Sequence, residues 1–178
     1  MLLFIDVETG GLNPDDSSLL EIAAIGTDMH GNELFSYHAH CLPDDQYFKI
    51  WPEALKVNNA DLTRNDRLPL LDIDDDIIEL LIHYNCNIPI GWNVQFDLSF
   101  IKRYLRRLHS TLDRRAIDLC GATRLFQLHD LLPKTKGMSL EKVATEYGLL
   151  KGKQQHTAMD DALLTLEMYK YIKHYVKP

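Results

Sequence analysis

The stretch Leu-Leu-Phe-Ile-Asp-Val-Glu-Thr-Gly-Gly occupies residues 2–11. Its first six residues, 2–7, form a short run rich in branched and aromatic side chains, which is typical of a buried strand. Side chains two positions apart point to the same face of a strand, so Asp6 and Glu8 share one face. The predicted core strand therefore ends in two carboxylates that lie side by side.

Two like charges at the end of a buried strand are unfavourable. Their mutual repulsion and their desolvation both disfavour the ionised pair unless a cation lies between them. The alternative is that the strand emerges into water at Asp6 and that both carboxylates are solvated. The Thr-Gly-Gly that follows lets a backbone approach a ligand closely, although alone it is only a turn.

The length and composition are those of one globular domain. The chain has 178 residues, of which 46% are apolar and 25% charged, with 9 Gly and 7 Pro, and this excludes disordered, collagen-like and fibrous classes. Three widely spaced cysteines favour a reducing compartment over a disulfide framework. No stretch approaches the roughly 18 apolar residues of a membrane span, and the opening run has no basic leader. We therefore expect a single domain over residues 1–178, a cytoplasmic location and no membrane association.

Charge is distributed unevenly along the chain, although the net charge is −7. Residues 1–97 contain 4 Lys and Arg against 18 Asp and Glu, whereas residues 98–156 contain 12 against 5. This division indicates either solvated surfaces of two signs or a cation-collecting acidic site beside a rim that holds a polyanion.

The predicted secondary structure is mixed. A turn near Gly31 and Asn32 joins two further strands into an antiparallel meander with the first. The later part of the chain alternates helices with short strands. The five predicted strands are 2–7, 19–25, 33–42, 87–91 and 115–118. Apolar residues at helical spacing predict helices over 70–84, 96–108, 140–147 and 162–172. This order favours an α/β fold with a mixed five-stranded sheet flanked by helices.

Two further polar clusters follow predicted elements. Residues 91–97 read Gly-Trp-Asn-Val-Gln-Phe-Asp, and Asp97 falls in the first turn of a helix, where the helix dipole also favours a carboxylate. His156 and Asp161 are five residues apart, or about 140° around an ideal helix. They can serve one site only if His156 stands on the loop before the helix, which the preceding Lys-Gly-Lys-Gln-Gln makes reasonable.

The three clusters together resemble the DEDDh 3'-5' exonuclease family, which includes the epsilon proofreading subunits of bacterial replicases, oligoribonucleases and ribonuclease T. The resemblance extends over essentially the whole chain and implies a ribonuclease H-like fold. The signature residues are Asp6, Glu8, Asp97, His156 and Asp161. The four carboxylates would hold two divalent metal ions, Mg²⁺ or Mn²⁺, because hard cations prefer oxygen ligands and two of them can assist in-line hydrolysis of a phosphodiester. His156 would act as the general base.

The resemblance also implies substrate contacts. The segment after the first strand corresponds to one that holds the terminal nucleotide, with Leu12 as an apolar wedge and with Gly10 where Thr is commoner. Residues 52–58 are similar to a loop in which a Glu binds the terminal 3'-hydroxyl. The expected substrate-binding residues are Thr9, Gly11, Leu12, Glu53, Asn58, Asn93 and Phe96.

Several other polar residues are expected to be structural. His38 and His40 share one strand face and could bind metal, but nothing nearby completes a ligand set. Asp118 is expected to cap a helix or to support the site indirectly. The acidic run in residues 72–76 is expected to be a solvated first helical turn.

We therefore expect a metal-dependent 3'-5' exonuclease that hydrolyses single-stranded nucleic acid, with DNA slightly favoured, to nucleoside 5'-monophosphates. Two alternatives stay open: an exoribonuclease or oligoribonuclease-type RNA trimming enzyme, and a noncatalytic nucleic-acid-binding or scaffold protein. Some basic residues between Lys102 and Lys153 would contact phosphates. The expected partners are the 3' ends of single-stranded DNA or RNA. A polymerase or repair protein in trans and a homodimer are compatible with the resemblance.

Overall fold

The computed structural model describes residues 1–43, 48–58, 61–150 and 157–176, without the side chains of residues 57 and 58. The strands are β1 (Leu2–Thr9), β2 (Leu19–Thr27), β3 (Glu33–Leu42), β4 (Leu68–Pro69), β5 (Ile88–Gly91) and β6 (Ile117–Asp118). The helices are α1 (Pro52–Asn58), α2 (Leu70–Tyr84), α3 (Val94–Tyr104), α4 (Arg106–Thr111), α5 (Leu119–Leu128), α6 (Leu140–Glu146) and α7 (Ala158–Tyr175). Within these ranges, no helix is long and apolar enough to cross a membrane.

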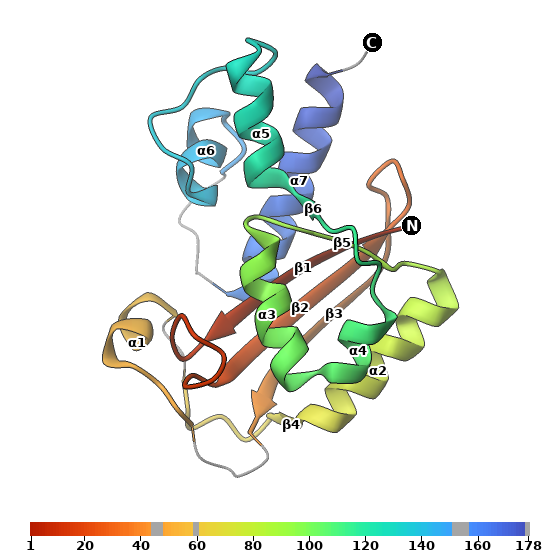
Figure 1. The fold of residues 1–178 in the computed structure, drawn as a ribbon, viewed down its shortest axis with the longest axis vertical. Coiled ribbons are helices and arrows are strands. Elements are labelled where there is room, and N and C mark those ends of the chain that lie inside the picture. Colours follow the sequence, from red (N-terminus) through yellow and green to blue (C-terminus); the bar gives the residue numbers. More distant parts are fainter. Residues whose placement is uncertain (44–47, 59–60, 151–156, 177–178) are drawn as a thin grey trace.

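The strands form one mixed sheet in the order β4-β3-β2-β1-β5-β6 (Figure 1). As predicted, β1, β2 and β3 form an antiparallel meander, whereas β5 runs parallel to β1 and β6 parallel to β5. The sheet has six strands and not the expected five. The additional strand, β4, has two residues and pairs with the end of β3 at Cys41 and Leu42. A two-residue strand shows no alternation of polar and apolar side chains, so periodicity does not reveal it.

Helices cover both faces of the sheet, and β1 contributes side chains to both (Figure 1). Its residues Leu3, Ile5 and Val7 belong to a core shared with α2, α3 and α4. Leu2 and Phe4 belong to a second core, shared with α5, α6 and α7. The carboxylates at the end of the strand continue this second face and are therefore directed toward α7.

The helix predicted over residues 96–108 is interrupted. α3 ends at Tyr104 and α4 begins at Arg106, because the backbone of Leu105 leaves helical geometry with φ −124° and ψ 65°. Leu105 and Leu108 are nevertheless both fully buried. The apolar stripe thus continues through the interruption, and its period does not reveal the break.

The start of α4 is capped by a side chain from another helix. Asp74 of α2 is buried, and its carboxylate accepts hydrogen bonds from the backbone N–H groups of Arg107 at 3.3 Å and Leu108 at 2.8 Å. The expectation of a solvated acidic turn over residues 72–76 is therefore wrong for Asp74. A helix start leaves backbone donors without partners in its own helix, and this carboxylate supplies them with acceptors.

We predict that Asp74→Ala lowers the free energy of unfolding by about 1–3 kcal/mol, because it leaves buried N–H groups without acceptors. Asp72 lies in the same helical turn but is exposed, so Asp72→Ala is the matched control and should change stability by less than about 0.5 kcal/mol. Urea denaturation of the two variants measures the difference. Equal stabilities would contradict the capping role.

Candidate active site

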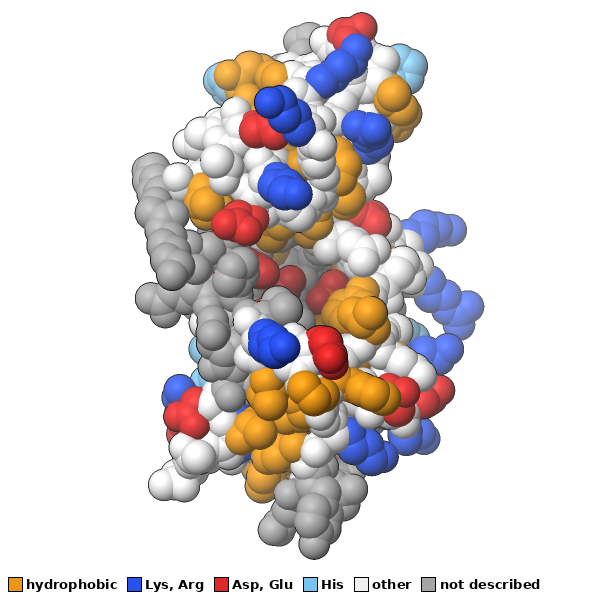
Figure 2. All heavy atoms as spheres, turned by 90° about the vertical axis from the view of Figure 1, so that its left-hand side faces the viewer, with side chains coloured by type: hydrophobic (Ala, Val, Ile, Leu, Met, Phe, Trp, Pro, Cys, Tyr) orange, Lys and Arg blue, Asp and Glu red, His pale blue; other side chains and the backbone are white. Residues whose placement is uncertain are grey.

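Three carboxylates from β1 and α7 meet at one end of the sheet. One oxygen each from Asp6, Glu8 and Asp161 lies within 4.8 Å of the others. Asp161 lies in the first turn of α7. Thr157 caps the start of this helix, because its side-chain hydroxyl accepts a hydrogen bond from the backbone N–H of Asp160 at 3.1 Å. All three carboxylates are half-buried. Figure 2 shows acidic side chains at the bottom of a hollow on one face of the molecule, with hydrophobic side chains beside it.

Asp97 lies beside this cluster, in the first turn of α3, and is buried. Its Oδ1 accepts a hydrogen bond from the backbone N–H of Val7 at 3.1 Å, which ties α3 to the strand that carries Asp6. Asn93 precedes the helix in the left-handed region, with φ 65°, a conformation that Asn tolerates better than most residues. The chain therefore turns sharply from β5 into α3. Asp97 is not among the three carboxylates whose oxygens converge within the described part of the chain.

Burial and repulsion shift the acid–base properties of these groups. Burial, followed by the charges of Asp97 and Asp161, raises the pKa of Asp6 well above its usual range. Burial, followed by the charge of Asp161, raises the pKa of Glu8 to about 8. Burial also raises the pKa of Asp97 to about 8, although its hydrogen bond from the β1 backbone acts in the opposite direction. Ionising the cluster without a cation is therefore unfavourable.

The donor set is suited to a hard divalent cation. Asp6, Glu8 and Asp161 offer carboxylate oxygens, which are the ligands that Mg²⁺ and Mn²⁺ prefer. Burial and, after it, repulsion between like charges raise these pKa values, and a bound cation would offset both by compensating the negative charge. The end of β1 is thus a site that can hold a divalent metal ion.

Two predicted site residues cannot be placed in this geometry. His156, the expected general base, lies outside the described residues. The side chain of Asn58, at the end of α1, also lies outside the described part of the structure.

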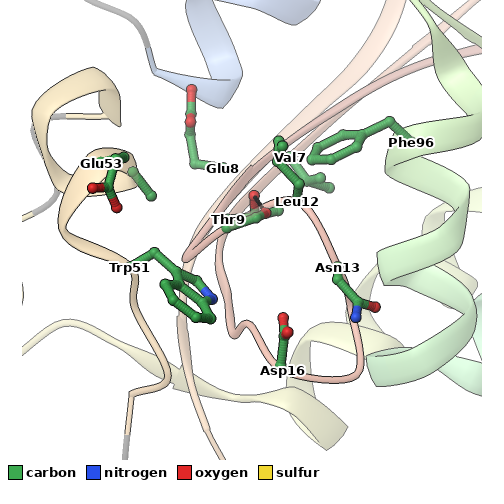
Figure 3. Close-up of a pocket in the computed structure, with 11 residues that line it drawn as sticks. Val7, Glu8, Thr9, Leu12, Asn13, Asp16, Trp51, Glu53 and Phe96 are labelled. Atoms are coloured by element: carbon green, nitrogen blue, oxygen red, sulfur yellow. Dashed lines mark hydrogen bonds between the residues drawn. The ribbon is translucent and has the colours of Figure 1, made fainter.

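A cavity of about 580 Å³ opens beside the carboxylates (Figure 3). Five of the seven predicted substrate-binding residues line it, namely Thr9, Gly11, Leu12, Glu53 and Phe96. Leu12, the predicted apolar wedge, is 86% exposed. Figure 3 shows Phe96 extending from α3 on one side of the pocket, with Glu53 on the opposite side.

Glu53 lies in the first turn of α1, not in a loop as expected for residues 52–58. Pro52 is the first residue of this helix, and its fixed φ favours that position. Asn93, the remaining predicted contact, is exposed at the start of α3, and its backbone N–H donates to Asp118 Oδ1 at 3.2 Å. Asp118 also accepts from the backbone N–H groups at the start of α5, which confirms its predicted capping role.

Trp51 is a pocket residue that sequence reasoning missed. It is 53% exposed and lines the cavity immediately before α1. Its backbone N–H donates to Gly10 O at 2.7 Å. A Cβ at Gly10 would lie 2.2 Å from the carbonyl oxygen of Lys49, so the backbone leaves no room for a side chain at this position. The close approach of the Gly10 and Trp51 segments positions the indole. In the sequence, the position of this Trp directly before the predicted substrate-binding residues 52–58 could have indicated its place in the pocket.

Three of the described basic residues between positions 98 and 150 form ion pairs with acidic residues. Arg103 lies 3.6 Å from Asp15, and Arg107 pairs with Asp75. Figure 2 shows Lys and Arg side chains outside the acidic hollow. Any contacts that these basic residues make with phosphates would therefore lie around the acidic site and not at the carboxylates themselves.

The fold and the carboxylate site define the 3'-5' exonuclease class predicted from the sequence. A family model described as Exonuclease matches residues 3–169, and the chain belongs to this family. The match confirms the predicted enzyme class and the resemblance to the DEDDh 3'-5' exonuclease family.

Individual relatives are distant but cover nearly the whole chain. Ribonuclease T of Histophilus somni (strain 129Pt) is 27% identical over 197 residues, with 98% of this chain and 84% of that protein covered. The DNA polymerase III PolC-type protein of Thermotoga petrophila is 24% identical, with 93% of this chain but only 11% of that protein covered.

Solved structures confirm the ribonuclease H-like fold. The zinc-bound form of the E. coli exonuclease I complex with single-stranded DNA superposes with a TM-score of 0.80 at 22% identity. A structure of exonuclease I alone gives a TM-score of 0.75 at 22% identity. This chain spans about 40% of the exonuclease I chain in the zinc-bound complex.

The raised pKa values predict a pH-dependent stability in the presence of chelator. Glu8 titrates near 4.3 when unfolded and at about 8 in the folded protein. Between these two pH values the folded state binds more protons than the unfolded state. The contribution of Glu8 to the free energy of unfolding therefore falls as pH rises from about 4 to 8. Denaturation of the wild type and of Glu8→Gln across this range isolates the contribution.

The wild type should lose more stability than Glu8→Gln as pH rises, and excess Mn²⁺ should remove the difference in slope. The exposed-site variant Asp72→Asn should retain the wild-type slope. A wild-type stability that rises relative to Glu8→Gln over this window would contradict the assigned repulsion.

Proposed function

We propose that residues 1–178 act as one exonuclease domain that removes nucleotides from the 3' ends of single-stranded nucleic acid and releases nucleoside 5'-monophosphates. The convergence of Asp6, Glu8 and Asp161 beside an open cavity carries this proposal. We further propose two divalent cations, Mg²⁺ or Mn²⁺, as cofactors. When bound, such a pair activates a water molecule and stabilises the leaving oxyanion.

The chain's own residues divide the remaining work. Asp6, Glu8 and Asp161 would hold the cations, and Asp97 would complete the acidic site from a position fixed by the backbone of Val7. His156 would take the proton of the attacking water, because an imidazole with a pKa near 6.5 can accept it near neutral pH. Its position in the sequence, five residues before Asp161, supports this role.

The cavity supports a single-stranded substrate. Leu12, Trp51 and Phe96 give it apolar and aromatic walls, on which unpaired bases can stack without regard to their identity. Glu53 lines the same cavity and would accept a hydrogen bond from the terminal 3'-hydroxyl. Bases in a duplex are already paired and stacked, so a frayed or single-stranded 3' end fits this pocket best.

We propose DNA as the slightly preferred substrate, and RNA trimming as the second candidate. The exonuclease I complex with single-stranded DNA and the PolC-type relative favour DNA, whereas the ribonuclease T relatives favour RNA. A polymerase or repair partner and a homodimer both stay predictions. The free thiols of Cys41, Cys86 and Cys120 fit the predicted cytoplasmic location.

The direct test uses 5'-labelled single-stranded DNA and RNA of the same sequence. With Mg²⁺ or Mn²⁺, we expect a ladder that shortens from the 3' end and disappears with chelator. Asp161→Asn should lower turnover by orders of magnitude because it removes a metal ligand, while His156→Ala should lower it about 10²–10⁴-fold, the usual contribution of a general base. The relative rates on the two strands identify the preferred sugar.

Asp160→Asn is the matched control, because Asp160 lies in the same first turn of α7 but outside the carboxylate cluster. Its activity should remain close to that of the wild type. Full activity in both Asp161→Asn and His156→Ala would overturn the assignment of the site. Binding of either strand without cleavage would favour the noncatalytic alternative.

We predict that Trp51→Ala raises KM for a single-stranded oligonucleotide and changes kcat little. Loss of one base-stacking contact costs about 1–3 kcal/mol. Trp51→Phe should retain most of the affinity, and Leu71→Ala removes a comparably exposed apolar side chain from α2 as a control. Steady-state kinetics on a short oligonucleotide measure these effects. An unchanged KM in Trp51→Ala would show that the indole does not contact the substrate.

A further inference from the structure

A second cluster of ligating side chains lies on β2 and β3. Nε2 of His38 lies 2.7 Å from Oε1 of Glu21, and Nδ1 of His40 lies 3.6 Å from Oε2 of the same carboxylate. The two imidazole rings have centroids 5.1 Å apart. One ligand atom from each of the three residues lies within 4.8 Å of the others.

The antiparallel register creates this cluster. His38 and His40 are two residues apart on β3 and therefore share a face, and Glu21 of β2 is paired directly with His40. The expectation that nothing completes a ligand set around the two histidines is therefore wrong. The third ligand comes from a neighbouring strand 17 residues earlier than His38, and sequence spacing alone does not specify that register.

The carboxylate of Glu21 is held in place from the helix side. Glu21 is buried, and its Oε1 also accepts a hydrogen bond from the backbone N–H of Ala158 at 2.9 Å, at the start of α7. Although burial acts in the opposite direction, the hydrogen bond from His38 and the charges of His38 and His40 lower the pKa of Glu21. Carboxylates that ligate a metal are typically oriented by a hydrogen bond from a group outside the coordination shell. The backbone N–H of Ala158 supplies such a hydrogen bond to Glu21.

We propose that Glu21, His38 and His40 form a binding site for one transition-metal ion of the zinc class, separate from the acidic cluster. Ligands of tetrahedral zinc lie about 2.0–2.2 Å from the ion, and hence about 3.4 Å from one another. Nδ1 of His40 lies 3.6 Å from Oε2 of Glu21, which is close to this value. Nε2 of His38 lies 2.7 Å from the other oxygen, Oε1, and must move away by less than an ångström. The His38 side chain is 34% exposed, which leaves a path for the ion and a fourth ligand from solvent.

The donor types distinguish this site from the acidic one. Two imidazole nitrogens suit Zn²⁺, Co²⁺ and Ni²⁺, whereas Mg²⁺ prefers oxygen alone. Glu21 is also the register partner of Glu8 across β1 and β2. A cation here would offset negative charge beside the acidic cluster and join β2, β3 and the start of α7. We therefore expect it to stabilise the fold.

The test is a titration with Zn²⁺ in excess Mg²⁺, which occupies oxygen sites but does not compete for imidazole. The wild type should bind one equivalent of Zn²⁺, and its melting temperature should rise. His38→Gln and His40→Gln should each weaken binding at least about tenfold, the lower end of the loss seen even for residues one shell removed from a metal. His83→Gln, which removes an exposed imidazole on α2, should bind as the wild type does.

Absorption by bound Co²⁺ gives a readout that does not depend on nuclease activity or on the change in stability. We expect ligand-field bands without a thiolate charge-transfer band, and their loss in His38→Gln. No binding in excess Mg²⁺ would overturn the proposal. So would binding that survives both histidine substitutions, or that is lost in Asp6→Asn but retained in His38→Gln.

Discussion

Burial of several like-charged carboxylates together at the end of β1 is the constraint on which the rest of the structure depends. Asp6 and Glu8 emerge together on one face of a strand that is otherwise buried on both sides, and burial raises both pKa values. Asp161 approaches from α7 and Asp97 from α3, so the charge concentrates further. The two apolar cores that enclose β1 hold these groups together. The resulting electrostatic cost is removed by a divalent cation, which couples folding energy to metal affinity.

The topology places a pocket next to this charge. β1 lies at the centre of the sheet between β2 and β5. The segment that follows β1 contacts the segment that precedes α1, where the backbone N–H of Trp51 donates a hydrogen bond to the carbonyl oxygen of Gly10. On the other side, α3 starts beside the end of β1 and contributes Phe96. The oxygen ligands thus lie beside aromatic and apolar walls. A terminal base stacked on these walls would place its phosphodiester beside the oxygen ligands. The exonuclease proposal requires this arrangement.

The sequence predicted the parts of this structure that depend on local pattern. Alternation in β1 located Asp6 and Glu8 on one face, and the apolar stripes located α2 and α7 to within a few residues. Features produced by tertiary contacts were missed. Asp74 caps a helix 33 residues away, and Glu21 meets His38 only through strand register. The two-residue β4 and the break at Leu105 do not change the spacing of apolar residues. Hydrophobic periodicity therefore predicts neither of them.

Proton release on metal binding tests the central claim most directly. Carboxylates with pKa values of about 8 are largely protonated near pH 7, and ligation requires them to ionise. Calorimetric titration with Mn²⁺ in two buffers of different ionisation enthalpy measures the protons released. The account predicts a net release near neutral pH that is reduced in Glu8→Gln and decreases as pH rises above 8. Tight Mn²⁺ binding without proton release near pH 7 would contradict it, because the acidic cluster would then be ionised without its cation.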